Sequence, residues 1–124
     1  MRLWLVDPKM MCRKHLLGEH VECHMFVGTI NKGVSVNGYV RLNLLEIEQL
    51  RSRHDELAIE IERRGYKHKT PLGEFSMQGI STQKINRHSA LSNLLKRCAN
   101  CRENLEKIIL ENQTTYLQNK TFPL

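Results

Sequence analysis

The sequence predicts an all-α fold, a single compact domain of three main helices with an extended N-terminal arm threaded between them. In three long stretches apolar residues recur at spacings of three and four, which is typical of helices that bury one face. The segments between these stretches contain the glycine, proline and asparagine residues that favour turns. Strand signals are weak throughout the chain. Its 124 residues are enough for one domain with a hydrophobic core, and we expect residues 1–124 to form it.

The chain begins with an arm, residues 1–8, that we expect to be extended or irregular up to Pro8. The first helix is predicted to begin between Lys9 and Cys12 and to run to about Lys32, with Gly33 ending it. One stripe of this helix is predicted to face the core, and it consists of Cys12, Leu16, Cys23, Val27 and Ile30. A row along the edge of that stripe, one residue per turn, consists of His15, Glu19, Glu22 and Phe26.

Residues 33–43 contain turn formers, and the second helix is predicted to follow them from about Leu44 to Arg64. Asn43 is a candidate N-cap, with Glu46 three residues on, and Gly65 ends the helix. Apolar surface comes from Leu45, Ile47, Leu50, Leu57, Ile59 and Ile61. Glu60 and Arg64 have the spacing of an ion pair within a helix, and we expect that pair on the surface.

Residues 66–80 are predicted to be a loop because Pro71, Gly73 and Gly79 interrupt any regular element. The third helix should begin at or just before Ser89 and continue to about Asn112. Its predicted core stripe consists of Leu91, Leu94, Leu95, Cys98, Leu105, Ile108 and Ile109. Residues 114–124 are expected to form an irregular arm.

The charge balance favours a polyanionic partner. The formal net charge is +6, and a basic protein gains affinity for nucleic acid by releasing counterions from phosphates. No apolar run approaches the roughly 20 residues that a bilayer requires, and the short apolar run after Arg2 is broken at Asp7 and Pro8. We therefore expect a cytoplasmic protein with reduced thiols and no membrane partner.

The four cysteines allow two interpretations. Cys98 and Cys101 have the spacing of metal ligands, but no second pair with that spacing accompanies them. Cys12 and Cys23 fall on the core side of the first helix. Buried or half-buried thiols are the favoured interpretation. The alternative is a zinc site that uses Cys98 and Cys101 together with a histidine.

Two blocks of the sequence carry a resemblance to a known family. The first consists of Met1-Arg2-Leu3-Trp4, Asp7-Pro8 and Cys12-Arg13-Lys14-His15-Leu16-Leu17-Gly18-Glu19-His20-Val21-Glu22. The second consists of Arg53-His54-Asp55-Glu56-Leu57, Glu62-Arg63-Arg64-Gly65-Tyr66 and Lys67-His68-Lys69-Thr70-Pro71-Leu72. With these blocks the chain resembles the pyrimidine-dimer DNA glycosylases of the phage endonuclease V family over about its first 72 residues.

The resemblance implies a DNA glycosylase with an associated abasic-site lyase, in which an N-terminal α-amine is the nucleophile. An α-amine with a pKa near ~7.7–8.0 is partly neutral at physiological pH, so it can attack C1′ of a nucleotide. In the family register this amine belongs to Met1, and the bulk of Arg2 should prevent removal of the methionine. The essential acid falls on Glu22. This chemistry requires no metal and no cofactor.

The resemblance also implies a DNA-binding surface on double-stranded DNA that contains a damaged or modified base. Arg2 matches a family arginine that contacts DNA, and the register places His15 and Glu19 beside the site. The basic residues expected to contribute to DNA binding are Arg13, Lys14, Arg63, Arg64, Lys67 and Lys69. We expect a monomer.

At two positions the chain departs from the family pattern. Val21 and Met25 stand where an arginine would grip phosphates around the lesion, and neither can make a charge-assisted contact. A lesion other than a pyrimidine dimer, or a modified base, is therefore an open alternative. Two further alternatives are a catalytically silent DNA-binding protein on the same scaffold and a small helical interaction protein.

Overall fold

A computed structural model describes residues 1–68 and 70–121, and it describes side chains as far as residue 113. Its elements in chain order are the short 3₁₀ turn η1 (Pro8–Met10), α1 (Arg13–Asn31), α2 (Asn37–Arg41), the 3₁₀ turn η2 (Ile47–Gln49), α3 (Leu50–Arg63), α4 (Arg87–Arg97) and α5 (Ala99–Thr121). The described residues include no strand, so the all-α prediction is confirmed.

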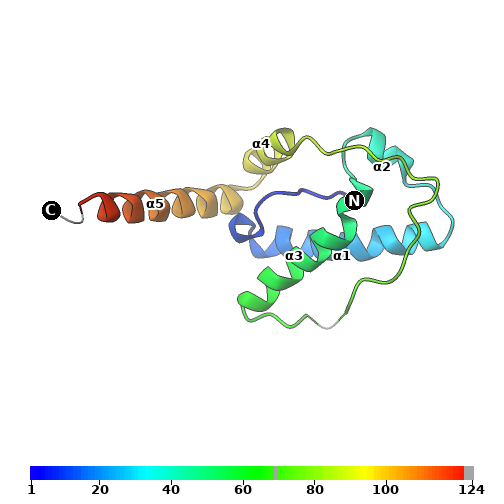
Figure 1. Cartoon of the computed structure of the whole chain (residues 1–124), viewed down its shortest axis with the longest axis horizontal. Helices are drawn as coiled ribbons and strands as arrows, with labels where there is room; N and C mark the ends of the chain where they lie inside the picture. Colours follow the sequence, from blue (N-terminus) through cyan, green and yellow to red (C-terminus); the bar gives the residue numbers. More distant parts are fainter. Residues whose placement is uncertain (69, 122–124) are drawn as a thin grey trace.

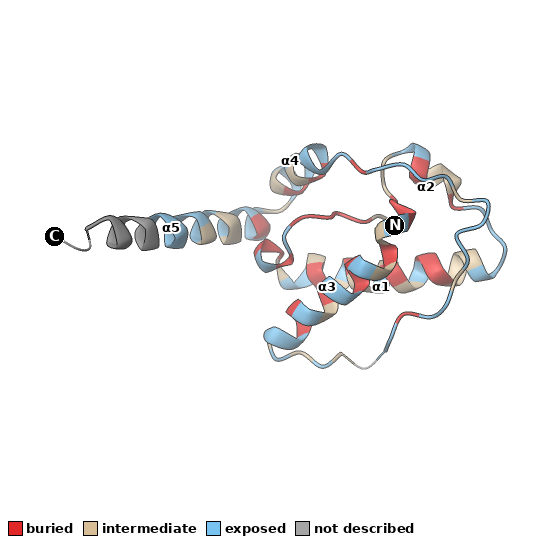
Figure 2. Ribbon diagram, in the orientation of Figure 1, coloured by how far each residue is buried: buried red, intermediate tan, exposed pale blue. Residues whose placement is uncertain are grey.

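The core lies where α1 crosses α3 and the N-terminal segment runs over both helices (Figures 1 and 2). Leu16 and Phe26 of α1 and Leu50 and Leu57 of α3 are fully buried, as is Leu3. The N-terminal segment is held by its backbone: Leu3 N donates to Leu44 O at 2.7 Å, and the side chain of Arg53 donates to Val6 O at 2.7 Å. These contacts fix the position of the residues next to the N-terminus.

The predicted ends of the first two helices are confirmed. Gly33 and Gly65 both have a left-handed backbone, with φ of 76° and 85°. In each case the next residue donates to a carbonyl five residues back, Val34 to Thr29 and Tyr66 to Ile61. This is the Schellman arrangement, which glycine adopts without steric cost.

The region before α3 differs from the prediction. The regular helix begins at Leu50, six residues later than expected, and residues 37–41 of the predicted turn region form α2. Asn43 is not an N-cap. It has a left-handed backbone, with φ of 63°, and its side chain hydrogen bonds to Asn86 N and Lys84 O. The asparagine amide thus joins two distant segments instead of capping its own helix.

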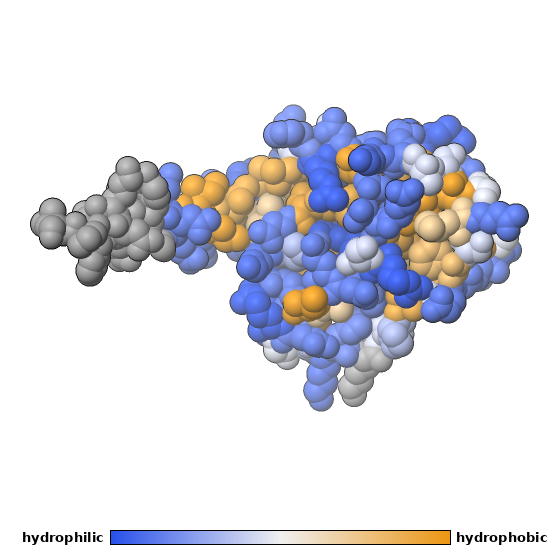
Figure 3. All heavy atoms as spheres, viewed as in Figure 1, coloured by the Kyte–Doolittle hydropathy of each residue, from blue (hydrophilic) through white to orange (hydrophobic). Residues whose placement is uncertain are grey.

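The predicted third helix is in fact two helices, α4 and α5, which are separated at Cys98 by an extended backbone (φ −128°, ψ 106°). Residues 114–121, predicted to be irregular, continue α5, and residues 122–124 lie outside the described part. In Figure 1, α5 projects away from the body. Figure 3 shows apolar side chains along its first half, where Leu110 is 61% exposed and Ile109 is 46% exposed despite its place in the predicted core stripe.

The ion pair expected on the surface of α3 is mostly buried. Glu60 is only 4% exposed and accepts hydrogen bonds from Arg63 and Arg64 at 2.6 to 2.7 Å. Arg64 also donates to Pro8 O and Met11 O, so the pair fastens the end of α3 to η1. Among the described residues, no helix is long and apolar enough to cross a membrane.

Candidate active site

The first residues of the chain lie directly against the middle of α1. The backbone nitrogen of Arg2 donates a hydrogen bond to Glu22 Oε2 at 3.0 Å. Because one residue of backbone separates the Met1 nitrogen from the Arg2 nitrogen, the Met1 amine lies within about 7 Å of this carboxylate. Glu22 is half-buried, so its carboxylate is also accessible from solvent. An amine and an acid are thus brought together from positions 21 residues apart.

The guanidinium of Arg2 lies over an aromatic ring near this carboxylate. Its guanidinium carbon is 3.7 Å from the centroid of the Trp4 ring, and the Arg97 guanidinium carbon is 5.9 Å from the same ring. Burial, together with the nearby positive charge of Arg97, lowers the pKa of Arg2 from its ordinary value. Trp4 itself is buried. Two cations therefore gather on one buried indole, which is a favourable cation–π arrangement.

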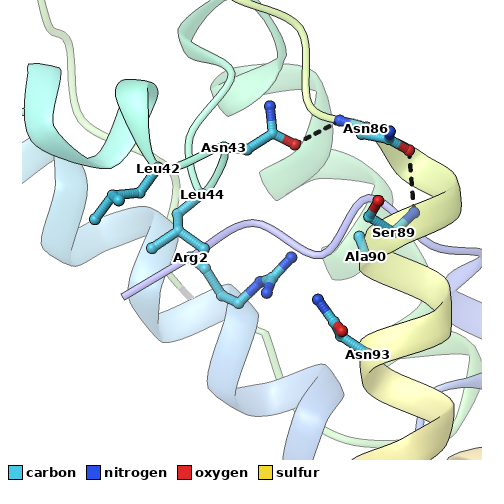
Figure 4. Close-up of a pocket in the computed structure, with 8 residues that line it drawn as sticks. All are labelled: Arg2, Leu42, Asn43, Leu44, Asn86, Ser89, Ala90 and Asn93. Carbon is cyan, nitrogen blue, oxygen red and sulfur yellow. Dashed lines mark hydrogen bonds between the residues drawn. The ribbon is translucent and has the colours of Figure 1, made fainter.

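A cleft of about 440 Å³ opens beside Arg2 (Figure 4). The guanidinium of Arg2 extends into the cleft toward Asn93 of α4. Asn43 Oδ1 accepts from Asn86 N at 2.6 Å, and Asn86 Oδ1 accepts from Ser89 N at 3.0 Å, so the far wall is held by a chain of amides. Sequence reasoning missed the asparagines of this wall. Asn86 and Asn93 lie more than forty residues after Asn43, and a single asparagine in or next to a helix does not by itself indicate a site.

Glu19, which the family register places beside the site, has a structural partner. Its carboxylate is fully buried and receives two hydrogen bonds from Arg53, at 2.6 and 2.9 Å. Burial opposes the charge of Arg53, but hydrogen bonds to Glu19 and Glu56 outweigh that effect and raise the pKa of Arg53. Glu19 therefore joins α1 to α3, and Glu22, three residues later, is the acid that faces the N-terminus.

The predicted basic residues that the structure describes form two groups: three exposed residues, and a pair of arginines that binds Glu60. Arg13 lies over the Tyr66 ring, with its guanidinium carbon 5.1 Å from the ring centroid, and Lys67 beside that ring is exposed. Lys14 is exposed as well. Arg63 and Arg64 bind Glu60, and Arg64 is largely covered. Lys69 lies outside the described residues.

Val21 and Met25 both project from the surface of α1, with exposed fractions of 54% and 48%. They flank Glu22 at helix positions one turn apart, so the face that surrounds the acid is apolar where the family pattern has arginine. Larger cationic side chains at these positions would have reached solvent. Their absence changes the contact surface and leaves the fold intact.

Five of the six histidines occupy two clusters, and His88 lies outside both. The sequence indicated the first cluster only as Cys98 and Cys101 with a histidine, and it did not indicate the second as a unit. His15 lies with Cys12, Cys98 and Cys101, and its Nδ1 atom is 3.2 Å from Cys12 Sγ. His20, His24, His54 and His68 form the second cluster, with ring centroids 4.6 to 5.2 Å apart wherever two rings are in contact. Burial and the neighbouring histidines lower the pKa of His20 to about 4. The spacing of four between His20 and His24 was the one signal of this cluster in the sequence.

Comparison with known proteins decides the family. The family model described as "Pyrimidine dimer DNA glycosylase" matches residues 1–73, more than half of the chain. The chain belongs to this family. No curated protein and no solved structure matches it. The matched region contains Met1, Arg2 and Glu22, whereas α4 and α5 lie beyond it. The chain is therefore a DNA glycosylase by family, with DNA as its substrate, and the resemblance drawn from its sequence is confirmed.

Proposed function

We propose that the protein excises a pyrimidine dimer, or another damaged or modified base, from duplex DNA and then cleaves the strand as an abasic-site lyase. The observation that carries the proposal is the hydrogen bond between Arg2 N and the Glu22 carboxylate. It supports a site in which the amine of Met1 and an acid act on one sugar. Family membership supplies the glycosylase part of the proposal, and the lyase part rests on this pairing.

The reaction begins when the neutral α-amine of Met1 attacks C1′ of the damaged nucleotide. A C1′–N bond forms to the amine as the C1′–N bond to the base breaks, and the base leaves with a proton. Opening of the sugar ring converts the adduct into an iminium ion. The iminium acidifies the C2′ proton, and loss of that proton drives cleavage of the C3′–O bond. The strand is thereby cut 3′ to the lesion.

Glu22 has two tasks in this scheme. Its carboxylate stabilises the positive charge that develops on the sugar and on the imine nitrogen. It also moves protons to and from the reacting groups. The hydrogen bond from Arg2 N leaves the second carboxylate oxygen available for these tasks.

The DNA would cross α1 with the damaged nucleotide extruded toward the cleft beside Arg2. An enzyme that acts at C1′ must take the base out of the stack, and a cleft of about 440 Å³ lined by asparagine and serine offers donors and acceptors for base edges. Arg13 lies nine residues before Glu22, about 14 Å along the helix. Arg13, Lys14 and Lys67 would therefore contact phosphates a few base pairs from the lesion. We propose that the protein acts as a monomer.

One observation favours a second candidate, a DNA-binding protein without catalysis. The apolar pair Val21 and Met25 next to Glu22 lacks the cationic grip that the family pattern has there. This candidate predicts salt-sensitive binding to DNA without any strand cleavage.

Cleavage of a duplex that contains one thymine dimer distinguishes the two candidates. The protein with a free Met1 amine should cut this duplex, and the same protein with one extra N-terminal residue should not. A matched variant with the extra residue after Leu124 should cut normally. Equal cutting by both extended variants would contradict the amine mechanism. Binding without cutting by the unextended protein would favour the silent candidate, and the absence of binding even at low salt would contradict both.

A further inference from the structure

We propose that Cys12, His15, Cys98 and Cys101 bind one zinc ion. One ligand atom from each of these residues lies within 4.8 Å of the ligand atoms of the others. Three thiols and one imidazole are a ligand set that structural zinc sites use, and four protein ligands leave no open position for catalysis. This proposal is independent of the proposed function.

The distances in this cluster fit tetrahedral coordination. With Zn–S bonds of about 2.3 Å and Zn–N bonds of about 2.0 Å, a tetrahedron places two sulfurs roughly 3.8 Å apart and a sulfur and a nitrogen roughly 3.6 Å apart. Cys12 Sγ lies 3.7 Å from Cys98 Sγ. His15 Nδ1 lies 3.2 Å from Cys12 Sγ and 3.9 Å from Cys101 Sγ. The sulfur–sulfur separation is close to the expected value, and the two sulfur–nitrogen separations lie on either side of theirs.

Backbone groups around the sulfurs act as a second layer of the site. Cys12 N donates to Cys101 Sγ at 3.2 Å, and Cys101 N donates to Cys98 Sγ at 3.4 Å. Hydrogen bonds of this kind orient ligands and stabilise thiolates. The first of these bonds joins residues 89 positions apart, so the sulfurs are positioned by the fold and not by local sequence alone.

The break between α4 and α5 is an independent observation that the zinc site explains. Residues 87–112 contain neither glycine nor proline, and their apolar spacing predicts one continuous helix. The chain instead leaves the helix at Cys98, where the backbone is extended, and re-enters it at Ala99. With this break in the helix, Cys98 and Cys101 lie against the N-terminal turn of α1. The free energy of metal binding would offset the helical hydrogen bonds that are lost at this break.

A different observation carries a second metal site, formed by His20, His24, His54 and His68. The Nε2 atoms of all four rings are buried and have no hydrogen-bond partner among the described residues. Ring nitrogens of the four lie within 4.8 Å of one another. A buried ring nitrogen without a hydrogen-bond partner is unfavourable, so four such nitrogens in one place indicate a shared ligand.

The chemistry of the four imidazoles specifies the class of ligand. Nδ1 of His54 lies 2.9 Å from Asp55 Oδ1, which fixes the ring so that Nε2 presents its lone pair inward. Neutral imidazoles ligate divalent first-row transition metals, zinc among them. His20 and His24 are two residues from Glu22 on either side, about 200° around α1, so the ion would lie on the face opposite the catalytic acid. Its role would be to join α1, α3 and the segment after α3.

The zinc content of untagged protein, purified under reducing conditions, tests both sites. We expect two equivalents of metal per chain in the unaltered protein. Cys98→Ser should lose one equivalent, whereas Cys23→Ala, which removes the one cysteine outside the cluster, should keep both. Wild-type metal content in Cys98→Ser, or a disulfide between Cys12 and Cys98 in the purified protein, would overturn the zinc site.

The histidine site has its own matched pair. His68→Ala should lose one equivalent, because this ligand lies in a loop where its removal leaves the core unchanged. His88→Ala alters the one histidine outside both clusters, exposed on α4, and should keep both equivalents. Equal metal content in these two variants would overturn the histidine site.

A spectroscopic measurement on the unaltered chain keeps both proposals falsifiable if a variant fails to fold. The metal is removed with a chelator under reducing conditions and replaced with cobalt(II). Ligation by three thiolates should give strong thiolate-to-cobalt charge-transfer absorption at the first equivalent or the second. Further cobalt that adds only weak ligand-field bands belongs to the histidine site. The absence of charge-transfer absorption would overturn the first proposal, and saturation at one equivalent would overturn the second.

Discussion

The carboxylate of Glu22 accepts a hydrogen bond from the backbone nitrogen of Arg2 at 3.0 Å, which joins the middle of α1 to the first peptide bond of the chain. Glu19, one turn earlier on the same helix, instead forms a buried salt bridge with Arg53. Two acids of the same type, three residues apart, therefore have different environments. The half-buried acid faces the candidate site, and the fully buried acid holds the fold.

Substitution of the half-buried acid, Glu22→Gln, should strongly reduce cleavage while preserving fold and DNA binding. The amide oxygen can still accept from Arg2 N, so we expect the free energy of unfolding to change by less than about 1 kcal/mol. Loss of the charge and of proton transfer should slow strand cleavage by about 10²–10⁴-fold. The measurements are single-turnover cleavage of damaged duplex and urea unfolding. Wild-type cleavage by this variant would remove Glu22 from the mechanism.

Substitution of the buried acid, Glu19→Gln, should instead destabilise the protein. The change leaves the Arg53 charge buried without its main partner, and Glu56 compensates only in part because its side chain is mostly exposed. We expect a loss of about 3 kcal/mol, at the lower end of the range for broken buried pairs. Urea unfolding measures it. If Glu19→Gln proved as stable as Glu22→Gln, the structural assignment of the pair would be wrong.

Glu60→Gln should reveal an acid-sensitive contribution to stability. Hydrogen bonds from Arg63 and Arg64 hold the pKa of Glu60 below its ordinary value, so the folded state binds this proton less readily than the unfolded state. The stabilisation is present above the unfolded pKa of about 4.3 and is lost as pH falls through the lower folded pKa. The variant should be less stable than wild type by about 1–3 kcal/mol at pH 7.

The difference between Glu60→Gln and wild type should then shrink as the pH falls below about 4.3. Unfolding by urea at several pH values provides the comparison. Glu62→Gln is the matched control, since Glu62 is an exposed acid on the same helix. A stability difference that stays constant from pH 7 to pH 3 would show that the charge of Glu60 is not its source.

Lys67→Ala should weaken binding to all duplexes by a similar factor. Lys67 is exposed beside the Tyr66 ring on which Arg13 lies, so it is placed for a phosphate contact. Loss of one such contact lowers the slope of log K against log salt by about 1. Lys107→Ala, on the projecting helix α5, should leave the slope unchanged. Identical slopes for both variants would place the DNA elsewhere on the surface.

Local chemistry made much of the fold predictable. The helix ends at Gly33 and Gly65 follow from the freedom of glycine to adopt positive φ, and the buried faces of the first two helices follow from apolar spacing. The break at Cys98 could not be predicted, because nothing in the nearby sequence opposes a helix there. It depends on contacts with Cys12, more than eighty residues away.

The candidate site was predictable only in part and for the same reason. The family resemblance indicated that the first residues and Glu22 belong together, and family membership is now established. The Asn43 side chain was mistaken for a helix cap because its true partners, Lys84 and Asn86, are distant in sequence. The histidine cluster likewise unites three separate segments, and only the spacing of His20 and His24 was visible beforehand.

The most direct test of the amine mechanism is borohydride trapping of the imine. Protein shown by mass to have an unblocked Met1 is mixed with a thymine-dimer duplex and with an abasic duplex, and each mixture is reduced. We expect a covalent protein–DNA complex with both, and peptide mapping should locate the adduct on Met1. An adduct on the abasic duplex alone would support the amine chemistry and would show that the protein removes a base other than a thymine dimer. No adduct on either duplex would contradict the account.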